Sequence, residues 1–383
     1  MGVLFWLSLI AFLGYGLIAL EVLPGSRRIR FLRDIPPELP QPPPSVTLIA
    51  AARNEERNLL QALQSLLTLD YPALELILVD DRSEDATGEI LDQLANKDPR
   101  LKVIHLTELP AGWLGKNHAL WVGSQQAGGE LLLFTDADVV MAPELLQRAV
   151  TYLEQNGVDH LALTPEARMP TTVLNTFGLA FGLIFAIFTR PWRVGDPASP
   201  CHIGIGAFNL VKAEAYRQVG GHGTIALRPD DDLKLGKILK RAGYRQQLLY
   251  GTGLVSVEWY ASVRQLIQGL EKNAFAGTDY RLGVALGGAL SLLVSSVWPY
   301  AALLLTRGPS WWLALATVAL ITLLLVDSAR RHHSSPWYAL GFPLAASLFA
   351  FIILRTTLLN LWQGGIHWRG TFYALEELRK NRV

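Results

Sequence analysis

The sequence predicts an α/β domain with a Rossmann-like, mostly parallel sheet, joined to transmembrane helices. Two observations predict this combination. From residue 45 to about residue 260, short apolar runs alternate with helical ones, and such alternation is typical of a parallel sheet. Elsewhere the chain is strongly apolar. Hydrophobic residues make up 50% of its 383 residues and charged residues only 17%, against about 25% in an ordinary soluble protein.

The charge balance and the cysteine count exclude several classes of function. Lys and Arg number 34 and Asp and Glu number 33, so the formal net charge is +1. Because proteins that track phosphates carry a clear basic excess, we expect no nucleic-acid partner. The single cysteine, Cys201, allows neither an intrachain disulfide nor a zinc site built on cysteines.

Residues 1–23 are predicted to form an N-terminal transmembrane anchor. The run from Met1 to Leu20 carries no charge, and about 20 apolar residues span a bilayer core. It lacks the basic start and the small-residue cleavage site of a signal peptide. Four arginines follow it: Arg27, Arg28, Arg30 and Arg33. By the positive-inside rule, the residues after the anchor lie in the cytoplasm. Residues 24–44 are a basic and proline-rich linker, which favours an extended polyproline-like spacer.

The next segment, residues 45–277, is the α/β domain. Four strands are predicted, at Val46–Ala51, Leu74–Val79, Leu101–Leu106 and Glu130–Thr135. Two helices are predicted between them, at Glu55–Leu69 and Thr87–Asn96. Ligands of such sheets bind at the carboxyl ends of the strands, so the functional residues are expected to follow the strands.

Carboxylates do follow the predicted strands. Asp80 and Asp81 come after the second strand, and Asp136 and Asp138 come after a later one. Two carboxylates separated by one residue in a turn can place oxygens around one hard divalent cation. We therefore expect Asp136 and Asp138 to bind one such cation. The alternative is that these loops are rich in Asp because Asp favours turns and caps helices.

Four motifs, taken in their order and spacing, resemble family 2 glycosyltransferases of the GT-A fold. They are AARNEE at 51–56, LVDDRSEDAT at 78–87, Asp-Ala-Asp at 136–138, and DDLKL at 231–235 followed by RAGYR at 241–245. The resemblance covers roughly residues 45–277. The segments GWLGK at 112–116 and WRGT at 368–371 further resemble membrane glycosyltransferases that act on hopanoids, carotenoids and ceramide-like lipids.

The resemblance implies a site for a nucleotide sugar, with UDP favoured as the nucleotide. The residues expected to bind it are Ala51, Arg53, Glu55, Asp80, Asp81, Lys116 and Asp136. The resemblance also implies that Asp136 and Asp138 would hold Mg or Mn, which would bridge the two phosphates. Lys116 follows a glycine-rich loop and would meet ribose or phosphate charge. Its alternative interpretation is an ordinary surface lysine.

The resemblance also implies the catalytic residues. When Leu235 and Gly243 are aligned with the family's leucine and glycine, Asp232 takes the position of the catalytic base. Asp231 then stands where the family usually has Glu, and Asp230 lies one residue early. The expected reaction is a single displacement that inverts the anomeric centre. The alternative is a helix N-terminus whose acidic residues complement the helix dipole.

The acceptor side is more weakly predicted. The candidates are His202, Gly206, Phe208, Gln268 and Lys272. The family's later motif, Gln followed after two residues by Arg-Trp, is changed here, because Glu271 and Lys272 replace Arg and Trp. This change favours transfer of one sugar over chain extension. A processive polysaccharide synthase, or a non-enzymatic membrane carrier with a regulatory nucleotide-binding domain, remains the alternative.

One uncharged run lies inside the domain, at 171–189. It stands between Asp138 and Asp232, which have to meet in one site, so an odd number of membrane crossings there is forbidden. Phe177, Phe181, Phe185 and Phe188 recur near helical spacing, which favours an interfacial helix that admits a lipid acceptor. The alternative is a buried core helix.

The C-terminal region, residues 282–361, is predicted to contain about three transmembrane spans, and residues 362–383 are a tail. Three crossings would leave the catalytic domain in the cytoplasm and the C-terminus outside. We therefore expect an integral protein of a bacterial-type cytoplasmic membrane. It would transfer one sugar from a nucleotide sugar to a hydroxyl of a membrane lipid such as a carotenoid, a hopanoid or a ceramide- or diacylglycerol-like acceptor.

Overall fold

The computed structural model describes residues 2–56 and 59–383, which form two compact units. The first, which we call the sheet unit, comprises residues 29–167, 191–258 and 380–383. The second, which we call the helical unit, comprises the N-terminal residues up to Arg28, with residues 168–190 and 259–379. Most of the predicted 45–277 domain therefore falls in the sheet unit.

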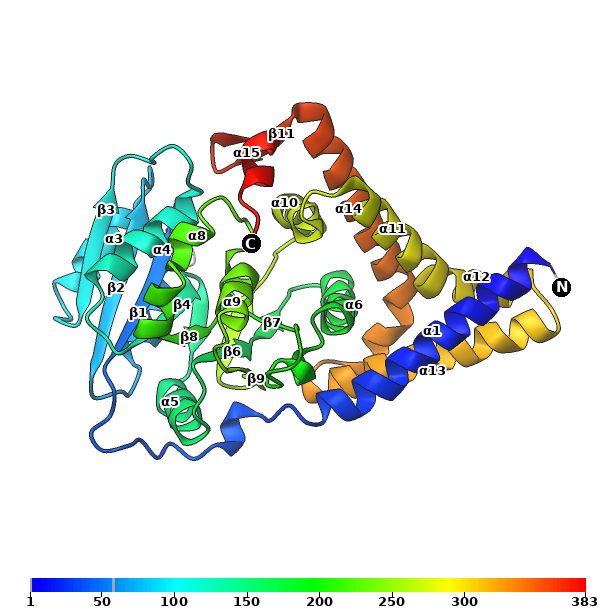
Figure 1. Ribbon diagram of the computed structural model, residues 1–383, viewed down its shortest axis with the longest axis horizontal. Helices are drawn as coiled ribbons and strands as arrows, with labels where there is room; N and C mark the ends of the chain where they lie inside the picture. Colours follow the sequence, from blue (N-terminus) through cyan, green and yellow to red (C-terminus); the bar gives the residue numbers. More distant parts are fainter. Residues whose placement is uncertain (1, 57–58) are drawn as a thin grey trace. The chain divides into compact units, whose positions relative to one another are not determined.

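The sheet unit is built on a seven-stranded sheet with the order β3-β2-β1-β4-β8-β6-β9 (Figure 1). Its strands are β1 (Val46–Ala52), β2 (Leu74–Asp81), β3 (Leu101–Leu106), β4 (Leu131–Asp136), β6 (His160–Thr164), β8 (Asn209–Lys212) and β9 (Gln246–Tyr250). Only β8 runs antiparallel to its neighbours. The prediction of an α/β fold with a mostly parallel sheet is confirmed. A smaller sheet pairs β5 (Val139–Met141) antiparallel with β10 (Val255–Glu258) and also contains β7 (Glu166–Arg168).

Apolar side chains fill both faces of this sheet, because successive residues of a strand point to opposite sides. Leu48 and Leu133 belong to the core on one face, and Ile49 and Phe134 belong to the core on the other. The helices of the sheet unit are α2 (Leu59–Leu67), α3 (Thr87–Ala95), α4 (Gly115–Gln126), α5 (Leu145–Gln155), α7 (Ala213–Gln218), α8 (Gly221–Thr224) and α9 (Asp231–Arg241). The first core contains residues of α2, α3 and α5, and the second contains residues of α4, α7 and α9.

The predicted elements recur with small shifts of their ends. Helix α2 begins at Leu59, whereas the prediction began it at Glu55; residues 57–58 of that prediction lie outside the described residues. Strands β2 and β4 run further than predicted and include Asp80, Asp81 and Asp136 as their last residues. These carboxylates are therefore held by the sheet itself.

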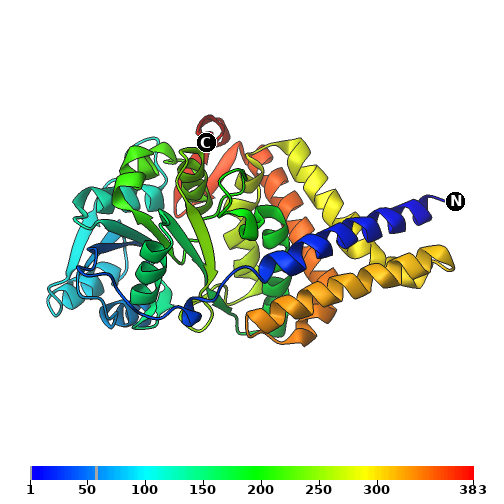
Figure 2. The same cartoon turned by 60° about the horizontal axis from the view of Figure 1, so that its bottom comes forward.

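The helical unit contains the long apolar helices. They are α1 (Val3–Ser26), α6 (Thr172–Thr189), α10 (Val263–Ala274), α11 (Leu282–Leu292), α12 (Trp298–Leu305), α13 (Pro309–Arg331) and α14 (Phe342–Gln363). A π-helical turn at Leu293–Val297 joins α11 to α12, and the hairpin β11 (Gly365–Trp368) and β12 (Thr371–Ala374) leads to α15 (Leu375–Lys380). Helices α1 and α13 lie side by side in both views (Figures 1 and 2).

Five segments of the described chain are long and apolar enough to cross a membrane. They are α1, α6 with the turn after it, α11 with α12, α13, and α14 with the turn before it. On α6, Phe177, Phe181 and Phe185 stack in a row with ring centroids 6.2 and 5.9 Å apart. Phe349 of α14 meets the first two rings edge to face.

The C-terminal residues Lys380–Val383 belong to the sheet unit. Asn381 is hydrogen-bonded there to Leu227 and to Thr224. A C-terminus on the opposite side of a membrane from the sheet unit would break these two hydrogen bonds.

Candidate active site

The carboxyl ends of β1, β2 and β4 meet at one edge of the sheet. The strand register sets Ala51 opposite Asp136 and Ala52 opposite Asp80. The loop after β1 is tied to the loop after β2, since Asn54 Oδ1 accepts from the Glu84 amide at 2.8 Å and the Glu55 amide donates to Thr87 Oγ1 at 2.9 Å. These bonds hold the predicted donor-binding segment 51–56 beside Asp80.

Asp80 and Asp81 are both buried, with 6% and 2% of their surfaces exposed, and both are already bonded. Asp80 accepts from the Ser83 amide at 3.1 Å and pairs with His105 Nδ1 at 3.0 Å. Hydrogen bonds to the carboxylates of Asp80 and Asp92 raise the pKa of His105.

Asp81 receives two hydrogen bonds from the guanidinium of Arg82, at 2.8 and 3.2 Å. It also lies against Gly115, where a Cβ would overlap its carboxylate. A carboxylate is favourable at a helix N-terminus, so this contact favours a role for Asp81 in holding the start of α4.

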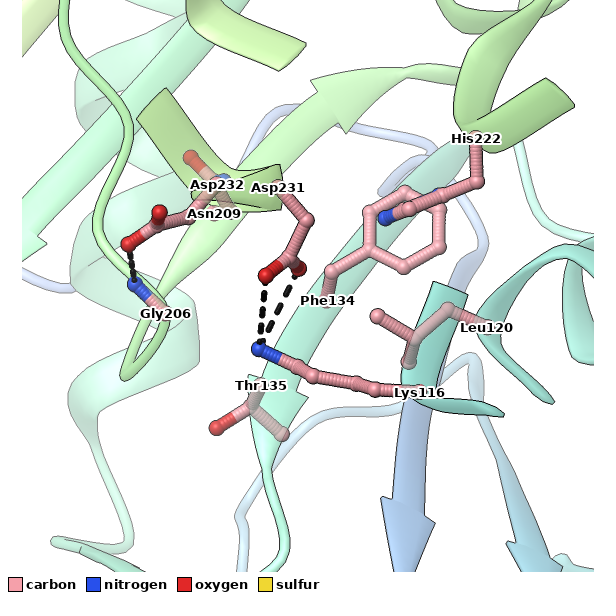
Figure 3. Close-up of a pocket in the computed structure, with 9 residues that line it drawn as sticks. All are labelled: Lys116, Leu120, Phe134, Thr135, Gly206, Asn209, His222, Asp231 and Asp232. Carbon is pink, nitrogen blue, oxygen red and sulfur yellow. Dashed lines mark hydrogen bonds and ion pairs between the residues drawn. The ribbon is translucent and has the colours of Figure 1, made fainter. Parts of the chain in front are cut away.

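Lys116 is the second residue of α4 and connects two acidic elements, of which Figure 3 shows the one that carries Asp231. Its Nζ lies 2.8 Å from Asp136 Oδ1, at the end of β4, and 3.1 Å from Asp231 Oδ2, at the start of α9. Burial lowers the pKa of Lys116, but the charges of Asp136, Asp231 and Asp232 raise it by a larger amount. The pKa is therefore above its usual value, and the ammonium stays charged. A cation in the first turn of a helix opposes the helix dipole, so these carboxylates are what stabilises it there.

Asp136 and Asp138 form a concentration of negative charge. The pKa of Asp138 is raised by burial and by the nearby carboxylates of Asp136 and Glu55. A divalent cation relieves such repulsion, and carboxylate oxygens are ligands that Mg and Mn prefer. Within residues 2–56 and 59–383, no group of three or more His, Cys, Asp or Glu side chains is arranged to hold a metal ion. The pair therefore fits a cation that takes its other ligands from water or phosphate.

Asp232 is held by the backbone. Its Oδ2 accepts from the Gly206 amide at 2.7 Å, and its Oδ1 accepts from the Leu233 amide at 2.7 Å (Figure 3). Burial and the charge of Asp231 raise the pKa of Asp232. A Cβ on Gly206 would lie 2.7 Å from Asp136 Oδ2 and 3.5 Å from Asp232 Oδ2. The carboxylates of Asp136 and Asp232 thus both lie close to Gly206.

Asp230 has a different environment from its two neighbours. It accepts two hydrogen bonds from the guanidinium of Arg228, at 2.9 and 3.0 Å, and Lys234 Nζ lies 3.5 Å away. Arg228 is only 1% exposed. This buried ion pair favours a structural role for Asp230, in keeping with its position one residue early in the alignment.

A small pocket lies between the start of α4, the end of β4 and the start of α9. Its lining residues are Lys116, Leu120, Phe134, Thr135, Gly206, Asn209, His222, Asp231 and Asp232.

Five of those pocket residues were absent from the predicted site: Leu120, Phe134, Thr135, Asn209 and His222. Two of the polar ones are bonded to buried partners. His222 Nδ1 lies 2.8 Å from Tyr216 Oη, and Asn209 Oδ1 lies 2.7 Å from His160 Nε2. Polar residues within apolar runs, such as Asn209 after Ala207 and Phe208, were the available signal in the sequence.

The predicted acceptor residues fall in both units. His202 and Gly206 lie in the sheet unit near α9, whereas Phe208 is fully buried in its core, which favours a packing role. Gln268 and Lys272 lie on α10 in the helical unit. There Lys272 Nζ stands 4.3 Å from the centre of the Trp368 ring.

Comparison with known proteins agrees with this geometry. Residues 47–220 match the model of glycosyl transferase family 2. The chain is 26% identical over 240 residues to a 4,4'-diaponeurosporenoate glycosyltransferase of Staphylococcus haemolyticus. This alignment covers 61% of this chain and 62% of that protein. It is 37% identical over 135 residues to a beta-monoglucosyldiacylglycerol synthase of Synechocystis, and that alignment covers 32% of this chain and 28% of that protein. The aligned part is thus less than two thirds of either relative.

Among solved structures, the fold is similar to that of the mannosyltransferase PcManGT from Pyrobaculum calidifontis, determined in complex with GDP-Man and Mn2+. The TM-score is 0.58 at 19% identity, with 94% of this chain and 99% of that chain covered. At this identity the likeness concerns the fold, and it confirms the predicted GT-A architecture. Residues 47–220 are thus similar to a glycosyl transferase family 2 domain.

Proposed function

We propose that this protein is a membrane-bound, inverting glycosyltransferase that transfers one sugar from a nucleotide sugar to a hydroxyl of a membrane lipid. One observation carries the proposal. Lys116 links Asp136, at the end of β4, to Asp231, at the start of α9, and so brings the predicted donor-binding carboxylate beside the predicted catalytic pair. Residues from three elements distant in sequence then meet in one pocket.

The donor side of the site would bind a diphosphate. Asp136 and Asp138 would hold Mg or Mn, which neutralises charge on the departing diphosphate when bound. Lys116 Nζ lies 2.8 Å from Asp136 Oδ1, so its ammonium would also meet phosphate oxygens. The fold relative from Pyrobaculum calidifontis was solved with GDP-Man and Mn2+, which supports a divalent cation here without choosing between Mg and Mn.

Asp232 would act as the general base. An acceptor hydroxyl has to lose a proton as its oxygen attacks the anomeric carbon, and a carboxylate with a raised pKa is suited to take it near neutral pH. The amide of Gly206 holds Oδ2 in place, so the carboxylate needs little reorganisation. One displacement inverts the anomeric centre, and no covalent intermediate is required.

The acceptor would be a membrane lipid. Two relatives are named for glycosylating a carotenoid acid and for making a glucosyldiacylglycerol, and the helical unit carries five segments long and apolar enough to cross a membrane. The stacked phenylalanines of α6 offer an apolar surface for such a molecule. On α10, Glu271 forms an ion pair with Arg355, so the change from the family's Arg-Trp has a structural use in this chain.

The sheet unit would lie in the cytoplasm, where nucleotide sugars are made. Four arginines between Arg27 and Arg33 follow α1, and the positive-inside rule keeps such clusters on the cytoplasmic side. Because the chain is in the sheet unit before and after α6, and again at its end, we infer that α1, α11 with α12, and α13 cross the bilayer. Helices α6 and α14 would then lie in its interface.

Transfer of labelled sugar to lipid tests the proposal. Membranes that contain the protein would be incubated with radiolabelled UDP-glucose or GDP-mannose, and the lipid extract would be separated by chromatography. We expect a labelled lipid that is absent with Asp232→Asn and present with Glu154→Gln, which makes the same chemical change on the exposed face of α5. Label that enters an extending polymer, or a labelled lipid with Asp232→Asn, would contradict the proposal.

A further inference from the structure

The segment 225–229 delivers the acidic pair to the site. It connects α8 to α9, and Asp231 and Asp232 are the first two residues of α9. The segment is neither helix nor strand, and its own backbone bonds are two turn bonds, from the Ile225 amide to the His222 carbonyl and from the Arg228 amide to the Ile225 carbonyl. The contacts from other elements therefore contribute to its conformation.

One side of this segment is held by α4. The buried amide of Asn117 donates to three carbonyls, those of Ile225 at 2.9 Å, Ala226 at 3.2 Å and Arg228 at 2.9 Å. The Leu114 amide also donates to the Ala226 carbonyl, at 2.9 Å. Because Lys116 is the neighbour of Asn117, the same helix end bonds both the segment and Asp231.

The C-terminal tail holds the segment at two further points. Asn381 Oδ1 accepts from the Leu227 amide at 3.0 Å, and its Nδ2 donates to the Thr224 carbonyl at 3.0 Å. One amide side chain thus satisfies a backbone donor and a backbone acceptor on either side of residues 225–226. Figure 1 shows the C-terminus beside α8. Val383 packs against the core that contains Leu235 and Leu239 of α9.

These contacts explain why the last four residues group with the sheet unit although α15 begins in the helical unit. We propose that Asn381 is a positioning residue for the catalytic pair. Through Thr224 and Leu227 it fixes the segment that carries Asp231 and Asp232 to the pocket, so the end of the chain is a working part of the transferase domain. The inference rests on the proposed function only where it names the pair as catalytic.

Three variants of the full-length protein in detergent test this role. Asn381→Ala removes both hydrogen bonds, and Asn381→Asp keeps the acceptor for Leu227 but removes the donor to Thr224. Glu377→Gln, on the exposed face of α15, is the control. Hydrogen exchange followed by mass spectrometry reports on peptides that cover residues 224–232, and transfer kinetics use the donor that labels lipid in the assay above.

With Asn381→Ala we expect exchange at residues 224–232 to be about tenfold faster, with the strands of the main sheet unchanged. We expect kcat to fall about three- to tenfold, the equivalent of one hydrogen bond, with KM for the donor unchanged. The exchange rate and the kcat of Asn381→Asp should both lie between those of the wild type and those of Asn381→Ala. Equal exchange in Asn381→Ala and Glu377→Gln would overturn the inference, as would a loss confined to KM. If the wild-type protein labels no lipid, the proposed function fails, and the exchange measurement still decides whether Asn381 fixes the segment.

Discussion

The ammonium of Lys116 lies 2.8 Å from Asp136 Oδ1, although the two residues belong to different elements of the sheet unit. Asp136 is also the carboxylate expected to bind the divalent cation. The carboxylate of Asp136 therefore contacts the fixed positive charge of Lys116 and is also expected to bind the divalent cation. Since like charges repel at such distances, the fixed charge and the cation compete for Asp136.

Replacement of Lys116 tests this competition. Lys116→Met keeps the length of the side chain and removes its charge, so Mn2+ added without donor should bind about three- to tenfold more tightly. Donor affinity should fall, because the diphosphate loses a positive partner. Mn2+ electron paramagnetic resonance measures the first effect, and titration with UDP and with GDP measures the second. Weaker Mn2+ binding in Lys116→Met would contradict the competition.

Neighbouring aspartates should respond in opposite ways to the same substitution. Asp230 is paired with Arg228, which is 1% exposed, and removal of one partner of a buried pair costs about 3–5 kcal/mol. Asp230→Asn should therefore lower the midpoint of thermal unfolding in detergent by several degrees. Asp232→Asn should raise it or leave it unchanged, because burial and Asp231 already disfavour charge at Asp232.

Activity completes the comparison. Asp232→Asn should abolish transfer while UDP or GDP still binds, since it removes only the base. A stable Asp230→Asn protein without transfer, beside an active Asp232→Asn protein, would show that the alignment of the acidic pair is displaced by two residues.

Local pattern was sufficient to predict the sheet and its acidic edge. Residues 46–51 and 131–135 are almost continuously apolar, as is typical of buried parallel strands, and parallel strands that begin together also end together. Asp80 and Asp136 were therefore predicted at one edge without knowledge of any contact. The ion pair between Lys116 and Asp231 was not, because 115 residues separate them and the helix packing that joins them leaves no periodic signal.

Hydropathy left the position of the tail open for a related reason. Hydropathy shows that a helix such as α14 is apolar, but apolarity alone does not distinguish a helix that crosses a bilayer from one that lies in its interface or packs on other helices. The contacts of Asn381 with Thr224 and Leu227 supply the missing information, and they depend on backbone groups that any sequence possesses.

Replacement of Gly206 and of Gly204 by alanine should have different effects, because the added methyl groups meet different atoms. A Cβ on Gly206 meets the end of the Asp136 side chain at 2.7 Å, and a side chain can move. A Cβ on Gly204 overlaps the backbone carbonyl of Asp232, which helix α9 holds fixed. Gly206→Ala should therefore fold normally and lose about 100-fold in kcat, the cost of a displacement near 1 Å. Gly204→Ala should lower the thermal midpoint. Equal activity in Gly206→Ala and wild type would show that Asp136 need not hold its position.

Acid should destabilise the sheet unit through buried histidines. Burial lowers the pKa of His160 from its usual 6.5 to about 4 and that of His222 to about 3, the latter with help from Lys116. Between pH 6.5 and 4 the unfolded chain takes up a proton at each position that the folded protein does not. Stability therefore falls as the pH falls, by up to about 1.4 kcal/mol per pH unit for each histidine.

His160→Gln isolates one of these contributions, because Gln can still donate to Asn209 and does not titrate. The thermal midpoints of the variant and the wild type should differ by a constant amount above pH 7. Below pH 6.5 the variant should lose less stability than the wild type. Parallel curves down to pH 4.5 would show that His160 is protonated in the folded protein.

The last prediction concerns the side of the membrane on which the chain ends. Asn381 binds the sheet unit, so the tail should share its side, and Arg379, Lys380 and Arg382 then also obey the positive-inside rule. In a Cys201→Ser background, Arg382→Cys should resist an impermeant thiol reagent in intact cells and react after lysis. Arg307→Cys, in the exposed turn between α12 and α13, should react in intact cells if α11 with α12 crosses once. Labelling of both positions in intact cells would mean that α14 crosses as well, and the bonds between Asn381 and the sheet unit could then not form in the membrane.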